Sequence, residues 1–174
     1  MKLKSALLVL GILSMSSLAS AMETQQLNGI TPDSTFKERL WVTPGMVSLH
    51  FDRNQGFNEA NYGFGVEYAL TKDWSLSGGT FRNSEYTQSK YAVAAYQPLD
   101  FFGFRLGVAG GIMDGYRGPN NKYEGKPFTV FMPVMSYEKQ NFGVNVLFVP
   151  SVNVNGDKLY GTLAFQLKFK PLNW

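Results

Sequence analysis

The chain has 174 residues with no Cys and one His, and its length fits one domain. Without Cys there is no disulfide framework or thiol nucleophile, and a single His argues against a multi-histidine metal site. The formal net charge of +3 includes no basic run that would suggest nucleic acid as a partner. The chain carries 14 Phe, 9 Tyr and 3 Trp against 16 basic and 13 acidic residues, and contact with a membrane would explain that balance.

The N-terminal segment has the three parts of a signal peptide. Lys2 and Lys4 open it, Ala6–Leu13 forms an apolar centre, and Ala19-Ser20-Ala21 provides a small-x-small cleavage pattern. The apolar centre is shorter than the ~20 residues that a membrane-spanning helix needs. We therefore expect residues 1–21 to be removed on export and the mature chain to begin at Met22. A buried N-terminal helix is the alternative.

Residues 22–44 lack the alternation of a strand. We interpret Thr35–Val42 within them as a short amphipathic helix, with a frayed linker as the alternative. Residues 45–174 then form the barrel domain. No apolar run after the leader approaches the ~18 residues of a helical span, so the chain could enter a membrane only as a closed barrel.

From Gly45 onward the chain divides into eight segments of about ten residues, the length of barrel strands tilted through a bilayer. Several segments alternate cleanly, as where Tyr62, Phe64 and Val66 are separated by Gly63 and Gly65. An even number of strands closes a sheet without an edge, so we predict an all-β fold, an eight-stranded antiparallel transmembrane β-barrel with a short N-terminal periplasmic segment. The predicted strands are Gly45–Arg53, Tyr62–Thr71, Trp74–Arg82, Ser89–Leu99, Phe104–Asp114, Phe128–Lys139, Phe142–Pro150 and Leu159–Phe169.

The connections between these segments alternate between short and long. The short ones are Lys72-Asp73, Asp100–Gly103 and Gln140-Asn141, and the long ones are Asn54–Asn61, Asn83–Gln88, Gly115–Pro127 and Ser151–Lys158. Such alternation is typical of outer-membrane barrels with short periplasmic turns and long external loops. We therefore expect a monomer in the outer membrane of a Gram-negative bacterium, with both chain ends on the periplasmic side. A soluble barrel that encloses a small ligand is the alternative.

His50 and Ser84 are the candidate chemical residues. A Ser hydroxyl is a poor nucleophile until a base takes its proton, and His is the usual base near neutral pH. His50 lies near the outer end of the first predicted strand and Ser84 just past the third, so both belong to the same rim of a narrow barrel.

Two prolines interrupt neighbouring strand patterns, Pro133 in the sixth and Pro150 in the seventh. Because proline cannot donate to a strand ladder, we expect a loosened seam facing the bilayer. The alternative is that Pro150 ends its strand while Pro133 sits on a bulge. Inward small residues leave volume for an acyl chain, or else accommodate larger side chains from opposite strands; they are Gly63, Gly65, Gly107, Ala109 and Gly111.

Together these residues resemble a known family. Phe81-Arg82-Asn83-Ser84 is similar to the Phe-Lys-Asp-Ser motif of the outer-membrane lipid A palmitoyltransferases, the PagP family. Asn58-Glu59 and the glycine-rich strand after it resemble that family's second strand, and His50 stands where the family has its active-site His. Pro133, Pro150 and the loop Asn153–Gly156 resemble the family's lateral lipid-entry seam. The resemblance runs from about Pro44 to Phe169.

The resemblance implies an enzyme that moves a palmitoyl chain from a phospholipid to lipid A, without cofactor or metal. His50 would be the general base and Ser84 the hydroxyl partner, but Asn83 stands where the family has Asp. An Asn cannot stabilise a forming imidazolium as a carboxylate does, so Asn83 would act as a polar orienter or oxyanion donor. Asp52, two residues beyond His50, is the first candidate for an orienting acid, with Glu59 and Asp114 as less direct alternatives.

The alternative function is a non-catalytic barrel that binds lipid or a surface partner through its external loops. The loop best suited to a partner is Gly115–Pro127, with Tyr116, Arg117, Lys122, Tyr123 and Lys126. Long external loops are polar in general, so this composition does not decide between the two functions. A conducting pore is not expected, because side chains fill an eight-stranded barrel.

Overall fold

The computed structural model describes residues 30–118, 124–154 and 157–171. The predicted signal peptide, residues 1–21, lies outside the described residues. In the part of the chain that is described, no helix is both long enough and apolar enough to cross a membrane.

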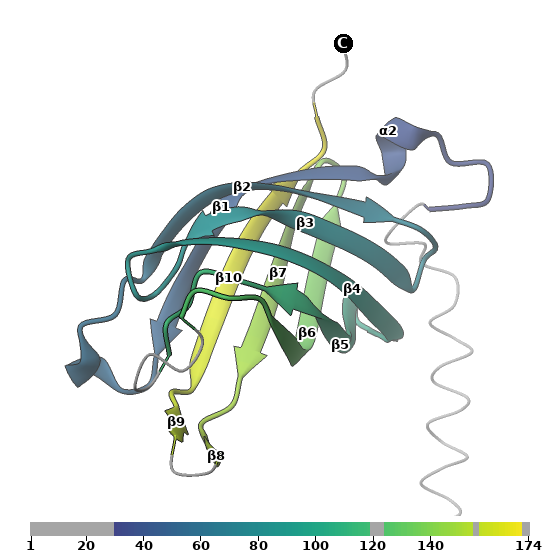
Figure 1. Cartoon of the computed structure of the whole chain (residues 1–174). Coiled ribbons are helices and arrows are strands. Elements are labelled where there is room, and N and C mark those ends of the chain that lie inside the picture. The colour runs from purple at the N-terminus through teal and green to yellow at the C-terminus, as the bar shows by residue number, and fades with distance from the viewer. Residues whose placement is uncertain (1–29, 119–123, 155–156, 172–174) are drawn as a thin grey trace, which may run out of the picture.

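Eight antiparallel strands form one closed barrel in the order β1-β10-β7-β6-β5-β4-β3-β2 (Figure 1). They are β1 (Leu40–His50), β2 (Ala60–Ala69), β3 (Trp74–Arg82), β4 (Gln88–Phe101), β5 (Phe104–Met113), β6 (Phe128–Lys139), β7 (Phe142–Val149) and β10 (Thr162–Phe169). β8 (Val152–Val154) and β9 (Asp157–Leu159) pair separately as a hairpin in the last long connection. The predicted eight-stranded antiparallel barrel is confirmed.

Two strand boundaries that were predicted wrongly lie close to prolines. β1 begins at Leu40 rather than Gly45, because the strand passes through Pro44 on a bulge where the register shifts between Thr43 and Gly45. β4 ends at Phe101 rather than Leu99, and Pro98 within it lies at a register shift between Tyr96 and Leu99. Proline has no N–H to donate, and a bulge is where a ladder tolerates that loss.

The predicted helix Thr35–Val42 is shorter than expected. α2 covers Phe36–Arg39, and Thr35 caps it in a capping box with Glu38. The Arg39 guanidinium fastens this segment to the barrel by donating to the carbonyl of Leu70 at 2.7 Å and to that of Thr31 at 2.6 Å. The residues after Arg39 belong to β1, where Trp41 turns inward and is 2% exposed.

The two ends of the barrel differ. One end, called here the short-turn end, holds the three tight connections, α2 and the end of β10; the opposite long-loop end holds β8–β9 (Figure 1). The strict alternation of short and long connections is therefore confirmed. The first strand ends at His50 rather than Arg53, because Asp52 caps a short 3-10 helix, η1 (Arg53–Gln55). The last strand begins at Thr162 rather than Leu159.

The outer face of the barrel is apolar and the interior is partly polar. On β2, Tyr62 is 75% exposed and Phe64 59%, whereas the inward Asn61 and Glu67 are buried. Other exposed apolar side chains continue this belt on the remaining barrel strands: Val47, Leu49, Trp74, Leu76, Tyr96, Leu99, Phe101, Phe104, Val108, Ile112, Phe131, Phe142, Phe148, Leu167 and Phe169. This arrangement is typical of barrels that face lipid.

Candidate functional site

Four ionised side chains fill the barrel interior at the short-turn end; we call Glu67, Arg105, Glu138 and Lys168 the charged cluster. Lys168 Nζ lies 2.5 Å from Glu67 Oε1 and 2.6 Å from Glu138 Oε1. Arg105 Nη2 lies 2.5 Å from Glu138 Oε1. Two cations therefore balance two anions, which is how proteins keep charges in a buried site.

Polar side chains of β4, β6, β7 and β10 lie directly against this cluster. Asn145 donates to Glu67 Oε2 at 2.8 Å and to Gln166 at 3.1 Å. Ser136 donates to Asn145 Oδ1 at 2.7 Å and receives a bond from Gln97 at 2.9 Å. The cluster and these polar groups satisfy one another across the barrel, so they form a polar floor that closes this end.

Above the floor the interior contains a cavity of about 620 Å³, within the usual range for small-molecule sites. Its walls are mainly apolar and aromatic. Ala95, Ala109 and Val134 form a buried cluster, against which Met132 and Leu147 pack. His50 and Ser84 also line this cavity.

The inward glycines of β2 do not supply the open volume. A Cβ on Gly63 would clash with Phe81, and a Cβ on Gly65 would clash with the Tyr91 hydroxyl. Gly65 thus makes room for a large side chain, that of Tyr91 on β4, whereas at Gly63 the nearest atoms are mainly backbone atoms of Thr80 and Phe81 on β3. Ala109, in contrast, lines the cavity itself.

The barrel wall is interrupted between β6 and β7. Their ladder ends at Val134–Leu147, although β6 continues back to Phe128 and pairs there with β5. Residues on both faces of β6 line the cavity, including the inward Met132 and the outward Phe131, which is 73% exposed. The cavity therefore reaches the outer face at this seam.

The two predicted seam prolines border this interruption. Pro133 is the residue of β6 next to the last ladder pair, and Pro150 follows the end of β7. Pro133 pairs with Val108 of β5, and this pairing shows no register shift, so Pro133 does not sit on a bulge in the β5–β6 ladder. Passage of lipid through this interruption stays a prediction.

His50 sits at the long-loop mouth of the cavity and is 7% exposed. Its ring lies 4.5 Å from that of Phe57, which in turn lies 5.3 Å from Tyr160. His50 Nδ1 is 3.8 Å from Glu59 Oε1, too far for a hydrogen bond, and no group of the described residues bonds to it.

Glu59, rather than Asp52, is the acid beside His50. Strand β1 ends at His50, so Asp52 is not on its face; the Asp52 carboxylate instead accepts from the Asn54 N–H at 3.2 Å. Glu59 Oε1 accepts from the His50 N–H at 3.2 Å and from Arg53 at 2.5 Å. The His50 N–H first, and Arg53 after it, hold the pKa of Glu59 below its usual range.

Ser84 lines the same cavity but bonds to Tyr116 rather than to His50. Burial raises the pKa of the Tyr116 hydroxyl, while its hydrogen bonds with Ser84 act in the opposite direction. No hydrogen bond joins His50 and Ser84 in the described part of the chain. Catalytic bonds often tighten only when substrate binds, and a catalytic pairing of His50 and Ser84 stays a prediction.

Asn83 is fully buried in the framework of the long loops. Its amide donates to Thr87 at 2.8 Å, to Ser89 at 3.0 Å and to the Gly115 carbonyl at 3.1 Å. Its carbonyl accepts from the Glu85 N–H at 2.9 Å and from the Thr87 N–H at 3.1 Å. A role as oxyanion donor would require the amide to leave these partners.

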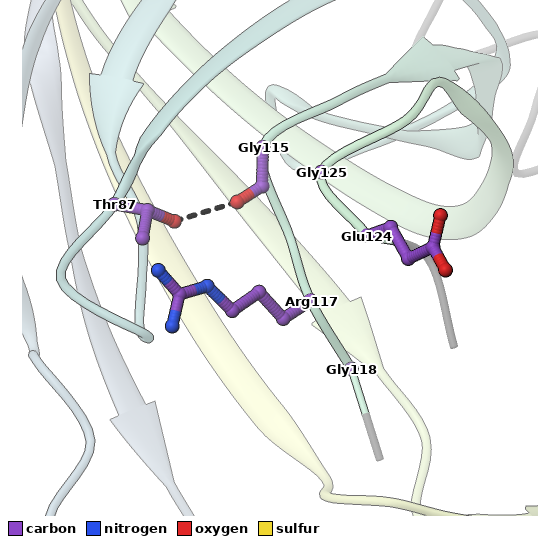
Figure 2. A pocket seen from close by; sticks show the side chains of 6 residues that line it. All are labelled: Thr87, Gly115, Arg117, Gly118, Glu124 and Gly125. Carbon is purple, nitrogen blue, oxygen red and sulfur yellow. Dashed lines mark hydrogen bonds between the residues drawn. The ribbon is translucent and has the colours of Figure 1, made fainter. Parts of the chain in front are cut away.

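The loops after β3 and β5 are also joined at the surface. Thr87 Oγ1 donates to the Gly115 carbonyl at 2.6 Å, and Figure 2 shows Arg117 extending from the second loop toward Thr87. Glu85 accepts from the backbone N–H of Arg117 at 2.6 Å and of Gly118 at 2.9 Å. Lys122 and Tyr123, proposed as partner contacts, lie outside the described residues.

Among the described residues, no group of three His, Cys, Asp or Glu side chains is placed to hold a metal ion. The charged cluster and Glu59 are the site features that sequence reasoning missed or ranked low. Alternation does place Glu67 and Lys168 on inward faces, but it cannot show that strands β2 and β10 bring them together.

No family model and no curated protein sequence matches the chain. Among solved structures, the N-terminal β-barrel domain of Pseudomonas aeruginosa OprF is similar in fold, with a TM-score of 0.42 and 16% sequence identity. The match covers 75% of this chain and 96% of that domain. A likeness at this level carries no functional argument, and the resemblance to lipid A palmitoyltransferases stays one of sequence pattern.

Proposed function

We propose that this chain is an outer-membrane barrel that holds one hydrocarbon chain of a membrane lipid in its interior cavity. One observation carries the proposal: an apolar cavity closed at its floor and open sideways where the β6–β7 ladder ends at Val134–Leu147. The apolar outer face supports placement in a bilayer, and the seam would then open directly onto lipid.

Burial of each methylene from water is worth about 0.8 kcal/mol, but a lipid chain comes from an equally apolar bilayer. The cavity is therefore favoured over the bilayer only through close packing around the lipid chain. The volume near the floor then determines whether a chain fits. Ala95 is buried there and lines the cavity, whereas Ala92 on the same strand is exposed on the outer face.

The test uses phospholipid retention. The mature chain is refolded in dipalmitoyl phosphatidylethanolamine, transferred to a detergent without a straight alkyl chain, and examined by native mass spectrometry. We expect one retained phospholipid per chain, lost in Ala95→Leu and kept in the matched control Ala92→Leu. Equal retention by the two variants would contradict a cavity site.

Entry through the seam has its own test. Continuation of the β6–β7 ladder would place Met132 opposite Val149, and the chain has no native Cys. Met132→Cys combined with Val149→Cys should block phospholipid exchange when oxidised and restore it when reduced. Exchange at the same rate in both states would exclude this route.

Acyl transfer to lipid A is the second candidate. His50, with the Glu59 carboxylate near its Nδ1, and Ser84 line one cavity mouth, which supports general-base chemistry on a bound acyl chain. Expression in a Gram-negative host without its own lipid A palmitoyltransferase should add a lipid A species heavier by one acyl chain, absent in His50→Ala and Ser84→Ala. An unchanged spectrum with the folded barrel in the outer membrane would leave lipid binding as the function.

A further inference from the structure

Two cations stand side by side on the outer face of the barrel near the long-loop end. Arg82 ends β3 and pairs with Gln88, while Lys90 pairs with Thr80, so the two cations are diagonal neighbours across β3 and β4. Both are exposed, and both alternate with buried inward residues, Phe81 and Ser89. Diagonal neighbours lie about 7–8 Å apart, within reach of one shared ligand. We call Arg82 and Lys90 the cationic rim.

Neither rim cation forms an ion pair with any carboxylate of the described residues. Other cations at this end do: Arg53 binds Glu59 at 2.5 Å, and Lys126 binds Glu124 at 2.6 Å. Asp114 accepts the backbone N–H of Lys90 at 2.7 Å rather than its ammonium group. The Arg82 guanidinium lies 5.3 Å from the centre of the Tyr86 ring, which orients it without neutralising its charge.

The rim lies at the depth expected of lipid headgroups. Phe101 and Phe104 mark the apolar belt at the short-turn end, and Lys90 and Phe101 lie near the two ends of β4. A rise of about 3.3 Å per residue and a tilt of about 40° place Lys90 roughly 28 Å above Phe101, close to the ~25 Å height of an apolar band. Lys90 therefore stands where hydrocarbon gives way to headgroups.

We propose that the cationic rim binds the phosphate groups of a lipid headgroup in the leaflet at the long-loop end. Like charges at neighbouring sheet positions repel, and a phosphate between them removes that repulsion. Arg82 supplies a fork that matches phosphate oxygens, and Lys90 extends its ammonium group along its alkyl stem to the headgroup level. This site rests on the proposed membrane placement but not on the cavity, because β3 and β4 do not border the β6–β7 seam.

The test measures binding of diphosphoryl lipid A to the mature chain by native mass spectrometry in mild detergent. The variant is Arg82→Gln with Lys90→Gln. The matched control, Arg53→Gln with Lys126→Gln, removes the same charge from ion-paired cations at the same end. Each cation near a lipid phosphate is expected to contribute about fivefold in affinity, so the rim variant should bind about 25-fold more weakly than wild type. The control should stay within about threefold of wild type.

Three results would overturn the proposal. Equal lipid A affinity in the rim variant and the control would show that these cations are not the site. Displacement of lipid A by an equal concentration of inorganic phosphate would identify a site for the free ion rather than the lipid. The third result would be a wild-type chain that binds no lipid A and forms a dimer, together with a rim variant that is monomeric. This result would assign the face to protein contact. The same spectra count phospholipid retained in the cavity separately from bound lipid A. Loss of retained phospholipid with lipid A binding unchanged would therefore contradict the cavity proposal and not the rim proposal.

Discussion

Replacement of Lys168 by Met should strongly destabilise the barrel. Lys168 is 0% exposed and contacts both Glu67 and Glu138. Without it, Glu138 keeps its direct ion pair with Arg105, whereas Glu67 keeps, among the described residues, the hydrogen bond from Asn145 and the more distant charge of Arg105. The loss therefore falls mainly on Glu67, and removing one partner of a buried pair costs about 3–5 kcal/mol.

A second substitution separates the lost ion pair from lost packing. Glu67→Gln added to Lys168→Met removes the uncompensated charge, so the double variant should recover about 2 kcal/mol or more of the loss. The matched surface control is Lys126→Met, whose pair with Glu124 is exposed on both sides. Such a pair contributes about 0–1 kcal/mol, so the control should stay close to wild type.

Urea unfolding of the chain in lipid vesicles measures all three variants. Trp41 is a suitable reporter, because Lys168 Nζ lies 5.1 Å from the centre of its ring. A free energy of unfolding for Lys168→Met within about 1 kcal/mol of wild type would refute the reasoning that the cluster is ionised and dry. So would a double variant no more stable than the single one.

Two further substitutions test close packing and the loop framework. Gly63→Ala would place a Cβ against the backbone of β3 and should destabilise the barrel by about 1–3 kcal/mol in the same urea assay. The control is Gly78→Ala on the outer face, which should be neutral because the nearest atom to its added Cβ is 3.4 Å away. Equal stability of the two variants would refute the packing argument. Asn83→Ala should raise the hydrogen-exchange rates of the Glu85 and Thr87 N–H groups without unfolding the strands, because it removes the oxygen that accepts from them. Unchanged rates would contradict this role of Asn83 and show that water replaces its amide fully.

Sequence alone was sufficient for the barrel because its determinants are local and repeat along each strand. Side chains alternate in direction with a period of two, so apolar and small or polar residues sort to opposite faces in any strand. Tight and long connections also reveal themselves by length and composition. The predicted first strand began just after Pro44, since the pattern cannot show that a bulge carries a strand past a proline. The predicted fourth strand already included Pro98 but ended at Leu99, two residues before the end of β4.

The candidate site was predictable only in part. His50 and Ser84 do line one cavity, as their positions on the same rim implied. The acid beside His50 was misjudged, because Asp52 is nearer in sequence while Glu59 is brought back by the turn between β1 and β2. Asn83 was considered as a catalytic residue, yet its amide donates to the carbonyl of Gly115, which lies in a loop far along the chain.

By itself, the sequence determined the number of strands, their antiparallel order, the two different ends and the inward or outward direction of most side chains. Only the tertiary structure decided which inward groups meet. Glu67 and Lys168 are about a hundred residues apart and are paired by barrel closure, and the seam beside Pro133 depends on where the β6–β7 ladder stops. Closure brings together side chains whose contacts depend on register and strand tilt, and those quantities are properties of the whole sheet rather than of any one segment.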